Sequence, residues 1–222
     1  MGFPRTLLLF CVLLAGVTPS VFAQVMETED SNTSGVKIRI SSITGLASMI
    51  SGENNGILPI DGNKEDPLAL FDIYGDSFGV KDAASELIRI ESFKDQLGQS
   101  HHRYQQVHRG VEVFTGRLIV HQNEAGDFLA VNGDFYPIRP GVPTQPLISV
   151  EEAQLLIETE LGLVNPVFGE ARLVLVDPRW YGDPSPGLVR LAYKMSAGGD
   201  GFVAEYVLID ARDRVVFDRW PA

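Results

Sequence analysis

The sequence predicts an α+β protein with two small domains, each an antiparallel sheet with one or two helices. Short segments in which apolar and polar side chains alternate, the pattern of half-buried strands, recur along the chain between turn-forming residues. Two further segments have the capping residues and apolar spacing of helices. A proline-rich linker at residues 137–147 separates the two groups of segments, because proline removes backbone donors and favours extended chain. We therefore expect domains at residues 36–136 and 148–218.

The composition excludes several classes of protein. The 222 residues include 29 acidic and 18 basic side chains, for a formal net charge of −11, and one cysteine, Cys11. A disulfide scaffold or a cysteine-ligated metal site needs several cysteines. A nucleic-acid-binding protein concentrates Lys and Arg against the phosphates. We therefore expect no nucleic-acid partner.

The first 23 residues have the pattern of a secretory signal peptide. A basic residue precedes an apolar run of about a dozen residues, and Val21 and Ala23 place small side chains at the two cleavage subsites. The run is shorter than the roughly 20 residues that cross a bilayer, which disfavours a retained anchor. We expect cleavage between Ala23 and Gln24 and a disordered mature N-terminus over 24–35. The chain is then secreted, extracellular or periplasmic, with no membrane anchor.

The first domain is predicted to be a meander of strands that follows a short helix. Asp66 and Pro67 are typical of an N-cap and a first helical residue, and Gly75 is expected to end this helix. Arg109-Gly110 predicts a two-residue hairpin turn. The expected strands are residues 36–40, 87–93, 101–108, 111–121 and 128–134. Apolar side chains expected on one face of the sheet are Phe114, Leu118, Val120, Leu129 and Val131.

The second domain is predicted to contain one helix and about four strands. Ser149 and Glu152 match a capping box, in which the hydroxyl and the carboxylate satisfy each other's first-turn amides, and Gly162 is expected to end the helix. The expected strands are residues 171–176, 188–195, 202–209 and 215–217.

The sequence contains no recognisable catalytic pattern. A zinc peptidase of the thermolysin kind needs His-Glu-x-x-His, and none of the four histidines is followed by Glu. His102 and His108 share a strand face but lie about 20 Å apart, so that they cannot bind one metal ion. His121 can approach a histidine of the neighbouring strand only if the register allows it. No Gly-x-Ser-x-Gly elbow is present, and the predicted mature chain has no cysteine. We expect no catalytic residue, metal site or cofactor.

One run of residues in the first domain resembles the prosequence of thermolysin-like and fungalysin-like metallopeptidases, the FTP domain. The matching residues are Asp95-x-x-Gly98, His101-x-Arg103-Tyr104-x-Gln106, Gly110, a strand that ends at His121, and Val131-Asn132-Gly133. The second domain resembles the PepSY domain that follows in such prosequences, although Arg212-Asp213-Arg214 stands where that family usually has a glycine turn. The resemblance covers about residues 36–218. It implies cystatin-like folds, and a partner peptidase whose folding the prosequence assists and whose activity it inhibits.

The resemblance implies a regulatory protein without its own catalytic domain. We expect it to bind a secreted thermolysin-like metallopeptidase in trans, with a C-terminal tail at residues 219–222 that reaches the partner's cleft. The predicted partner-binding residues are His101, Arg103, Tyr104, Gln106, Arg109, Gly110, Asp218, Arg219 and Trp220. Two alternatives stay open for Arg103 and Gln106, which either tie neighbouring strands together or contact the partner. For the whole chain the alternatives are a truncated metallopeptidase precursor and an envelope-associated structural module.

Overall fold

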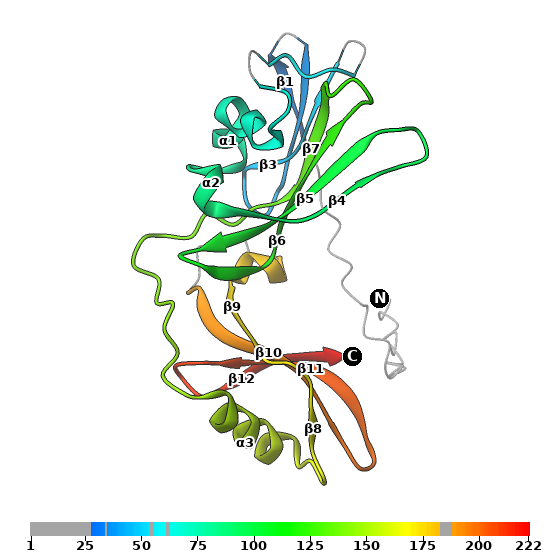
Figure 1. Cartoon of the computed structure of the whole chain (residues 1–222). Helices are drawn as coiled ribbons and strands as arrows, with labels where there is room; N and C mark the ends of the chain where they lie inside the picture. The colour runs from blue at the N-terminus through cyan, green and yellow to red at the C-terminus, as the bar shows by residue number, and fades with distance from the viewer. Residues whose placement is uncertain (1–27, 34, 54–55, 61–62, 183–187) are drawn as a thin grey trace, which may run out of the picture.

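The computed structural model describes residues 28–33, 35–53, 56–60, 63–182 and 188–222 (Figure 1). The predicted signal peptide and its cleavage site between Ala23 and Gln24 lie outside the described residues. No helix within the described ranges has the length and apolar character needed to cross a membrane.

The fold is of the α+β class and consists mostly of strands (Figure 1). We call β1–β7 with their helices the N-terminal half, and α3 with β8–β12 the C-terminal half. The elements of the N-terminal half are β1 Thr28–Thr33, β2 Val36–Ile40, β3 Ala47–Gly52, η1 Pro67–Leu70, α1 Phe71–Phe78, α2 Ala83–Glu86, β4 Leu87–Lys94, β5 Ser100–His108, β6 Val111–Gln122 and β7 Phe128–Asp134. Those of the C-terminal half are α3 Val150–Leu161, β8 Val167–Phe168, β9 Arg172–Val176, η2 Pro178–Tyr181, β10 Arg190–Gly199, β11 Phe202–Asp210 and β12 Val216–Pro221.

The twelve strands of the described residues belong to one curled mixed sheet, which corrects the expectation of two separate antiparallel sheets. The main order is β1-β2-β3-β7-β6-β9-β10-β11-β12, with β5 on the other edge of β6, β4 beside β5, and β8 beside β10. Every pairing is antiparallel except that of β6 with β9, which is parallel and joins Glu112 to Val174 and Val113 to Leu175. The two halves therefore share a sheet through β6.

Strand β6 serves both halves because its backbone changes direction in the middle. Its C-terminal part, from Arg117 onward, pairs with β7, whereas Glu112 and Val113 pair with β9. Between these parts Thr115 has a left-handed backbone conformation, with φ of 62°. Such an irregularity breaks the alternation of faces along a strand.

Three apolar clusters form the core. One fills the N-terminal half and includes Leu118, Val120 and Val131. A second lies under α3 and includes Val113. The third, on the opposite face of the C-terminal half, includes Phe114. Three of the five residues predicted to share a face, Leu118, Val120 and Val131, therefore do so. Phe114 lies on another face because the backbone is irregular at Thr115. Leu129 is replaced in the core by Phe128 because the register of β6 and β7 shifts after His121.

The helix predicted from Asp66 is present but longer than expected. Asp66 caps η1 by accepting a hydrogen bond from Leu68 N at 3.0 Å, and α1 follows at once. Gly75 lies within α1, where a side chain would meet Val80 O at 3.2 Å, and the helix ends instead at Gly79, which has φ of 85°. Gly75, which was expected to end the helix, instead allows the backbone at Val80 to pass close to α1.

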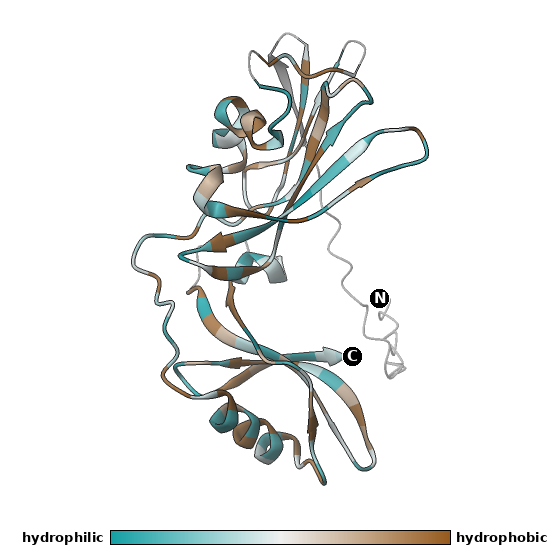
Figure 2. Ribbon diagram, in the orientation of Figure 1, coloured by the Kyte–Doolittle hydropathy of each residue, from teal (hydrophilic) through white to brown (hydrophobic). Residues whose placement is uncertain are grey.

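Helix α3 packs on the sheet of the C-terminal half and carries both hydrophobic and hydrophilic positions (Figure 2). Ala153 and Ile157 are its fully buried side chains. The Ser149 hydroxyl accepts a hydrogen bond from Glu152 N at 3.2 Å, which confirms half of the predicted capping box. The carboxylate of Glu152 instead accepts a hydrogen bond from Arg214 Nε at 2.9 Å, so it fastens the helix to the turn before β12.

Two segments predicted without regular structure form edge strands. Residues 28–33, within the expected disordered N-terminus, form β1, which pairs with β2. The expected C-terminal tail belongs to β12, where Trp220 lies opposite Tyr206 and Pro221 opposite Glu205. Pairing with β11 holds these residues in the sheet, so that they cannot act as a free tail. Residues 135–149, which include the predicted linker at 137–147, contain no helix or strand.

Candidate functional site

A cleft of about 700 Å³ lies between the two halves on one face of the shared sheet. We call it the central cleft. Its N-terminal wall comes from β2, β3 and β7 and includes Met49, Asn132 and Asp134. Its C-terminal wall comes from η2 and β12 and includes Trp180 and Trp220. The cleft therefore exists only because the sheet curls and carries both halves.

Aromatic rings dominate the C-terminal wall. The ring centroids of Phe114 and Trp180 are 5.2 Å apart at 76°, and Trp220 lies 5.9 Å from Phe114 and 5.8 Å from Tyr206. The ammonium group of Lys194 stands 4.6 Å from the Tyr206 ring centroid and 5.8 Å from that of Phe114, within the range of cation–π attraction. Trp180 remains 39% exposed, so the cluster offers a large apolar surface to a partner.

Two carboxylates line the central cleft, Asp218 on the C-terminal wall and Asp134 on the N-terminal wall. Asp218 accepts a hydrogen bond from the Tyr181 hydroxyl at 3.0 Å, and burial together with this carboxylate raises the pKa of Tyr181. Asp134 has no hydrogen-bond or ion-pair partner among the described residues, and desolvation by the surrounding cleft raises its pKa. The N-terminal wall therefore presents a carboxylate that no side chain of the described chain neutralises.

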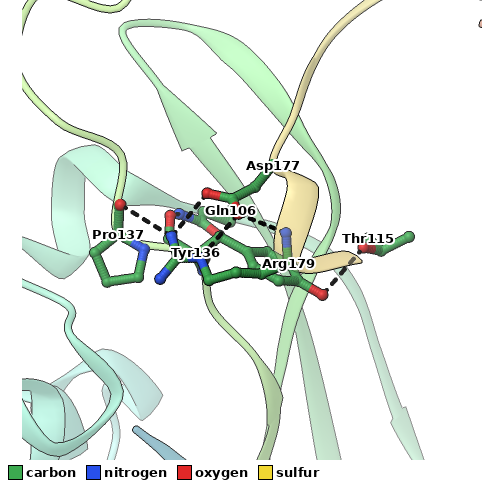
Figure 3. A network of polar contacts seen from close by, with 6 residues as sticks. All are labelled: Gln106, Thr115, Tyr136, Pro137, Asp177 and Arg179. Atoms are coloured by element: carbon green, nitrogen blue, oxygen red, sulfur yellow. Dashed lines mark hydrogen bonds and ion pairs between the residues drawn. The ribbon is translucent and has the colours of Figure 1, made fainter. Parts of the chain in front are cut away.

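The side chain of Gln106 joins β5 to the chain that leaves the N-terminal half (Figure 3). Its amide nitrogen donates to Tyr136 O at 2.7 Å, and its amide oxygen accepts from Tyr136 N at 2.9 Å. Gln106 is 2% exposed. Its amide thus completes the backbone hydrogen bonding that a neighbouring strand would otherwise supply.

A buried ion pair attaches the C-terminal half to the same point (Figure 3). Arg179 donates from Nε to Asp177 Oδ1 at 2.8 Å and from Nη2 to Asp177 Oδ2 at 2.7 Å, the fork geometry of a strong pair. Arg179 Nη2 also donates to Pro137 O at 3.3 Å, and its guanidinium lies 5.8 Å from the Tyr136 ring centroid. Asp177 is 3% exposed. These contacts hold the start of η2, and with it Trp180, against the N-terminal half.

Two of the predicted partner-binding residues are buried in the N-terminal half, and two others form an exposed turn. Tyr104 and Gln106 are each 2% exposed, because they point into the core of the N-terminal half and toward Tyr136. Arg109 and Gly110 form the predicted two-residue turn, with φ of 52° and 82°, away from the residues that line the central cleft. Positive φ at both positions is the type I′ hairpin geometry, so these two residues have a sufficient structural role.

Arg103 ties two strands together, as one of the two alternatives for it proposed. Its guanidinium forms an ion pair with Glu91 of β4, with Nη1 and Oε2 2.5 Å apart, and lies 5.1 Å from the ring centroid of Phe93. Arg219 of β12 similarly lies 3.7 Å from Glu205 of β11. Asp218 and Trp220 are the predicted residues that do line the central cleft.

His101 is part of a chain of polar contacts that runs from the β4–β5 turn across the three strands β5, β6 and β7. Its Nε2 lies 3.1 Å from Asp95 Oδ2, and its Nδ1 lies 2.7 Å from His121 Nδ1. His121 Nε2 lies 2.6 Å from Asn132 Oδ1, and Asn132 also lines the central cleft. The register allows His121 to approach His101, its direct partner across the strand pair. Within the described ranges, no group of three or more His, Cys, Asp or Glu side chains is arranged to hold a metal ion.

The sequence offered only weak signals for the rest of the cleft. Trp180 follows an Asp-Pro pair that caps η2, and Gly182 ends that turn, so a local turn could be expected there but not its docking on Phe114. Asp134 follows the predicted Val-Asn-Gly segment without being singled out. Trp180 and Asp134 line the cleft because strands far apart in the sequence pair with each other, β6 with β9 and β7 with β3.

Comparison with known proteins supports one part of this description. The chain matches no curated protein. Residues 85–135, which run from the end of α2 through β4, β5, β6 and β7, match a family model. This span contains the whole chain of polar contacts from Asp95 to Asn132 and supplies part of the N-terminal wall of the central cleft. The model is that of the Fungalysin/Thermolysin Propeptide Motif, so residues 85–135 of this chain are similar to that motif.

Proposed function

We propose that the chain is a secreted, propeptide-like regulator that binds a thermolysin-like zinc peptidase in trans, and inhibits it or assists its folding. The match of residues 85–135 to the fungalysin/thermolysin propeptide motif carries this proposal. The C-terminal half is part of it as a PepSY-like unit, in which α3 covers one face of strands β9–β12. Such a unit binds a peptidase through its surface, and the central cleft is the surface that we propose for this contact.

The central cleft has the properties of a protein-binding surface. Trp180 is 39% exposed and Tyr181 is 51% exposed, and both lie beside Trp220 on the C-terminal wall. Exposed tryptophan and tyrosine side chains contribute most to binding when a partner covers them, because they bury a large apolar area and lose little conformational entropy. The opposite wall adds the carboxylate of Asp134, which has no hydrogen-bond or ion-pair partner among the described residues and to which a basic group of the partner can bind.

The contacts between the halves keep this surface in one shape before a partner arrives. Gln106 holds Tyr136 by two hydrogen bonds, and Arg179 joins Asp177 to Pro137 O. A surface that is already ordered loses less entropy on binding than one that must be assembled. The proposed mode of binding is therefore docking of the peptidase onto a preformed face.

The test uses the purified full-length chain, a purified thermolysin-like peptidase and three readouts. Binding is measured by calorimetry, inhibition by hydrolysis of a peptide substrate, and folding assistance by recovery of activity from the denatured peptidase. Trp180→Ala should weaken binding, whereas the matched change Leu155→Ala on the outer side of α3, where Leu155 is 61% exposed, should not. Absence of binding, inhibition and improved refolding with the unchanged protein would refute the proposal and favour a structural module.

A further inference from the structure

His101 and His121 form a pair whose hydrogen bonds fix the positions of their protons. His101 Nε2 faces a carboxylate oxygen of Asp95 at 3.1 Å, and His121 Nε2 faces the amide oxygen of Asn132 at 2.6 Å. Both oxygens only accept hydrogen bonds, so each Nε2 must carry a proton. The Asp95 side chain is itself oriented, because its other oxygen accepts hydrogen bonds from Leu97 N at 2.8 Å and from Gln99 N at 3.0 Å.

The two remaining nitrogens, Nδ1 of each ring, lie 2.7 Å apart. If both rings are neutral, two lone pairs face each other and no hydrogen bond forms. If both rings are cationic, two N–H groups and two positive charges face each other. One proton between the nitrogens gives a hydrogen bond, and Asp95 balances the single positive charge. The geometry therefore favours a total of three N–H protons on the two rings, one more than two neutral histidines carry.

We propose that His101 and His121 share one proton at neutral pH, and that uptake of a second proton in mild acid loosens the turn end of the β4–β5 hairpin. This is a proton-operated element on the sheet face that continues into the central cleft through Asn132. It rests on the contacts of the pair alone and does not require that the chain bind a peptidase.

The surroundings of the pair offer little to balance a second charge. Phe93 stacks on His101 with ring centroids 4.8 Å apart, and the cross-strand neighbour of His121 on β7 is Ala130. The charged or titratable side chains of this face and its edges, among the described residues, are Lys37, Arg39, Glu91, Arg103, Arg117, Glu124 and Asp134, with His102 on the opposite face of β5. Among these, Glu91 is already paired with Arg103. Asp95 is the carboxylate in direct contact with the pair, and its single negative charge balances only the first positive charge.

The direction of the pH dependence follows from protons bound in each state. In the unfolded chain both histidines titrate near pH 6.5. In the folded chain burial lowers the pKa of His121 and is the largest effect, the hydrogen bond that His121 donates to Asn132 raises this pKa, and the charge of His101 lowers it further. At about pH 6.5 the two unfolded histidines bind about one proton in total, as many as the closed pair, and about a unit lower they bind nearly two. Below about pH 6.5 the unfolded or locally opened chain therefore binds more protons than the closed pair, and acid favours opening.

The proton count is tested by ¹⁵N NMR of the imidazole nitrogens in the full chain at about pH 7.5. We expect protons on both Nε2 atoms and one proton shared between the Nδ1 atoms. A neutral pair, in which the Asn132 amide is turned and donates to a bare Nε2 of His121, would overturn the proposal.

The loosening is tested by hydrogen exchange of residues 93–101, with α3 as the internal reference for global stability. We expect the exchange rate of this segment, divided by its intrinsic rate at each pH, to rise between about pH 7 and pH 5, by about tenfold for each unit by which the pKa of the second protonation is lowered. Asn132→Asp gives His121 its own carboxylate and should remove the rise. His108→Gln, a matched control on β5 whose pKa is also lowered by burial, should retain it. An unchanged rise in Asn132→Asp, or its loss in His108→Gln, would contradict the proposal.

Discussion

The side-chain amide of Gln106 makes two hydrogen bonds with the backbone of Tyr136, 30 residues later in the chain, at 2.7 and 2.9 Å. Opposite this residue the pairing of β5 with β6 is interrupted, since Gln105 pairs with Arg117 but Val107 pairs with Glu112. The preceding Gln105 fills that interruption by donating to Val113 O at 2.8 Å and Gly116 O at 2.9 Å. Two adjacent glutamines thus replace missing ladder bonds where β6 passes from one half to the other.

Replacement of Gln106 by alanine should destabilise the protein by about 3 kcal/mol, because two buried backbone groups of Tyr136 lose their partners. The free energy of unfolding from urea titration measures the effect. Gln145→Ala, at an exposed position of the linker, should change that free energy by less than about 0.5 kcal/mol. Equal effects of the two changes would show that the amide of Gln106 contributes nothing special.

Gly116→Ala should disturb the contact between Gln106 and Tyr136 indirectly, because the new side chain would collide with Gln106. A Cβ atom there would lie 2.4 Å from Gln106 Oε1 and 2.9 Å from Gln106 Cβ, so the glutamine must shift and its bonds to Tyr136 must lengthen. We expect a loss of about 2 kcal/mol. Gly198→Ala in β10 is the control, because its nearest neighbour would be Ala204 Cβ at 3.4 Å. Thermal unfolding of the two variants compares them, and a larger loss for Gly198→Ala would contradict this explanation.

Global stability should decrease as the pH falls below about 6.5. Burial is the largest cause that lowers the pKa values of His102, His108 and His121 in the folded protein. The unfolded chain then binds more protons than the folded chain between the ordinary histidine pKa and these lowered values, so each histidine costs stability in that window. Urea unfolding at several values between about pH 8 and pH 5 measures the trend, and a rise in stability toward pH 5 would contradict it.

The secreted protein should begin at Gln24. This prediction depends on the charged, apolar and small-residue order of the first 23 residues. Expression of the full sequence in a secreting host, followed by mass spectrometry of the exported chain, determines the terminus. An exported chain that keeps residues 1–23, or retention of the whole chain in the membrane fraction, would show that the segment is not a cleaved signal.

The strands and turns of the first domain could be predicted because they are encoded locally. Arg109-Gly110 needs only its own backbone preference to form the turn, and the alternation of apolar residues marks β5, β6 and β7. The single sheet could not be predicted in this way. It depends on the irregular backbone at Thr115 and on the parallel pairing of β6 with β9, which are separated by about 60 residues of sequence and leave no periodic signal.

The candidate site was predicted only in part for the same reason. The sequence predicts the motif residues around His101 as a binding site. It could not show that Tyr104 and Gln106 point into the core, or that Arg103 forms an ion pair with Glu91. Nothing in the local sequence distinguishes Trp180 from the other aromatic residues, and its position beside Phe114 and across the cleft from Asp134 follows from the curl of the sheet. Local patterns specify strands, whereas a cleft between strands depends on their register.

Calorimetric titration of a thermolysin-like peptidase with the unchanged protein, Trp180→Ala and Leu155→Ala tests the central claim most directly. We predict that the unchanged protein and Leu155→Ala bind with the same affinity. Trp180→Ala should bind at least about tenfold more weakly, as expected for loss of a well-covered aromatic side chain. Equal affinity of all three proteins would contradict the assignment of the central cleft, and absence of binding by all three would contradict the proposed function itself.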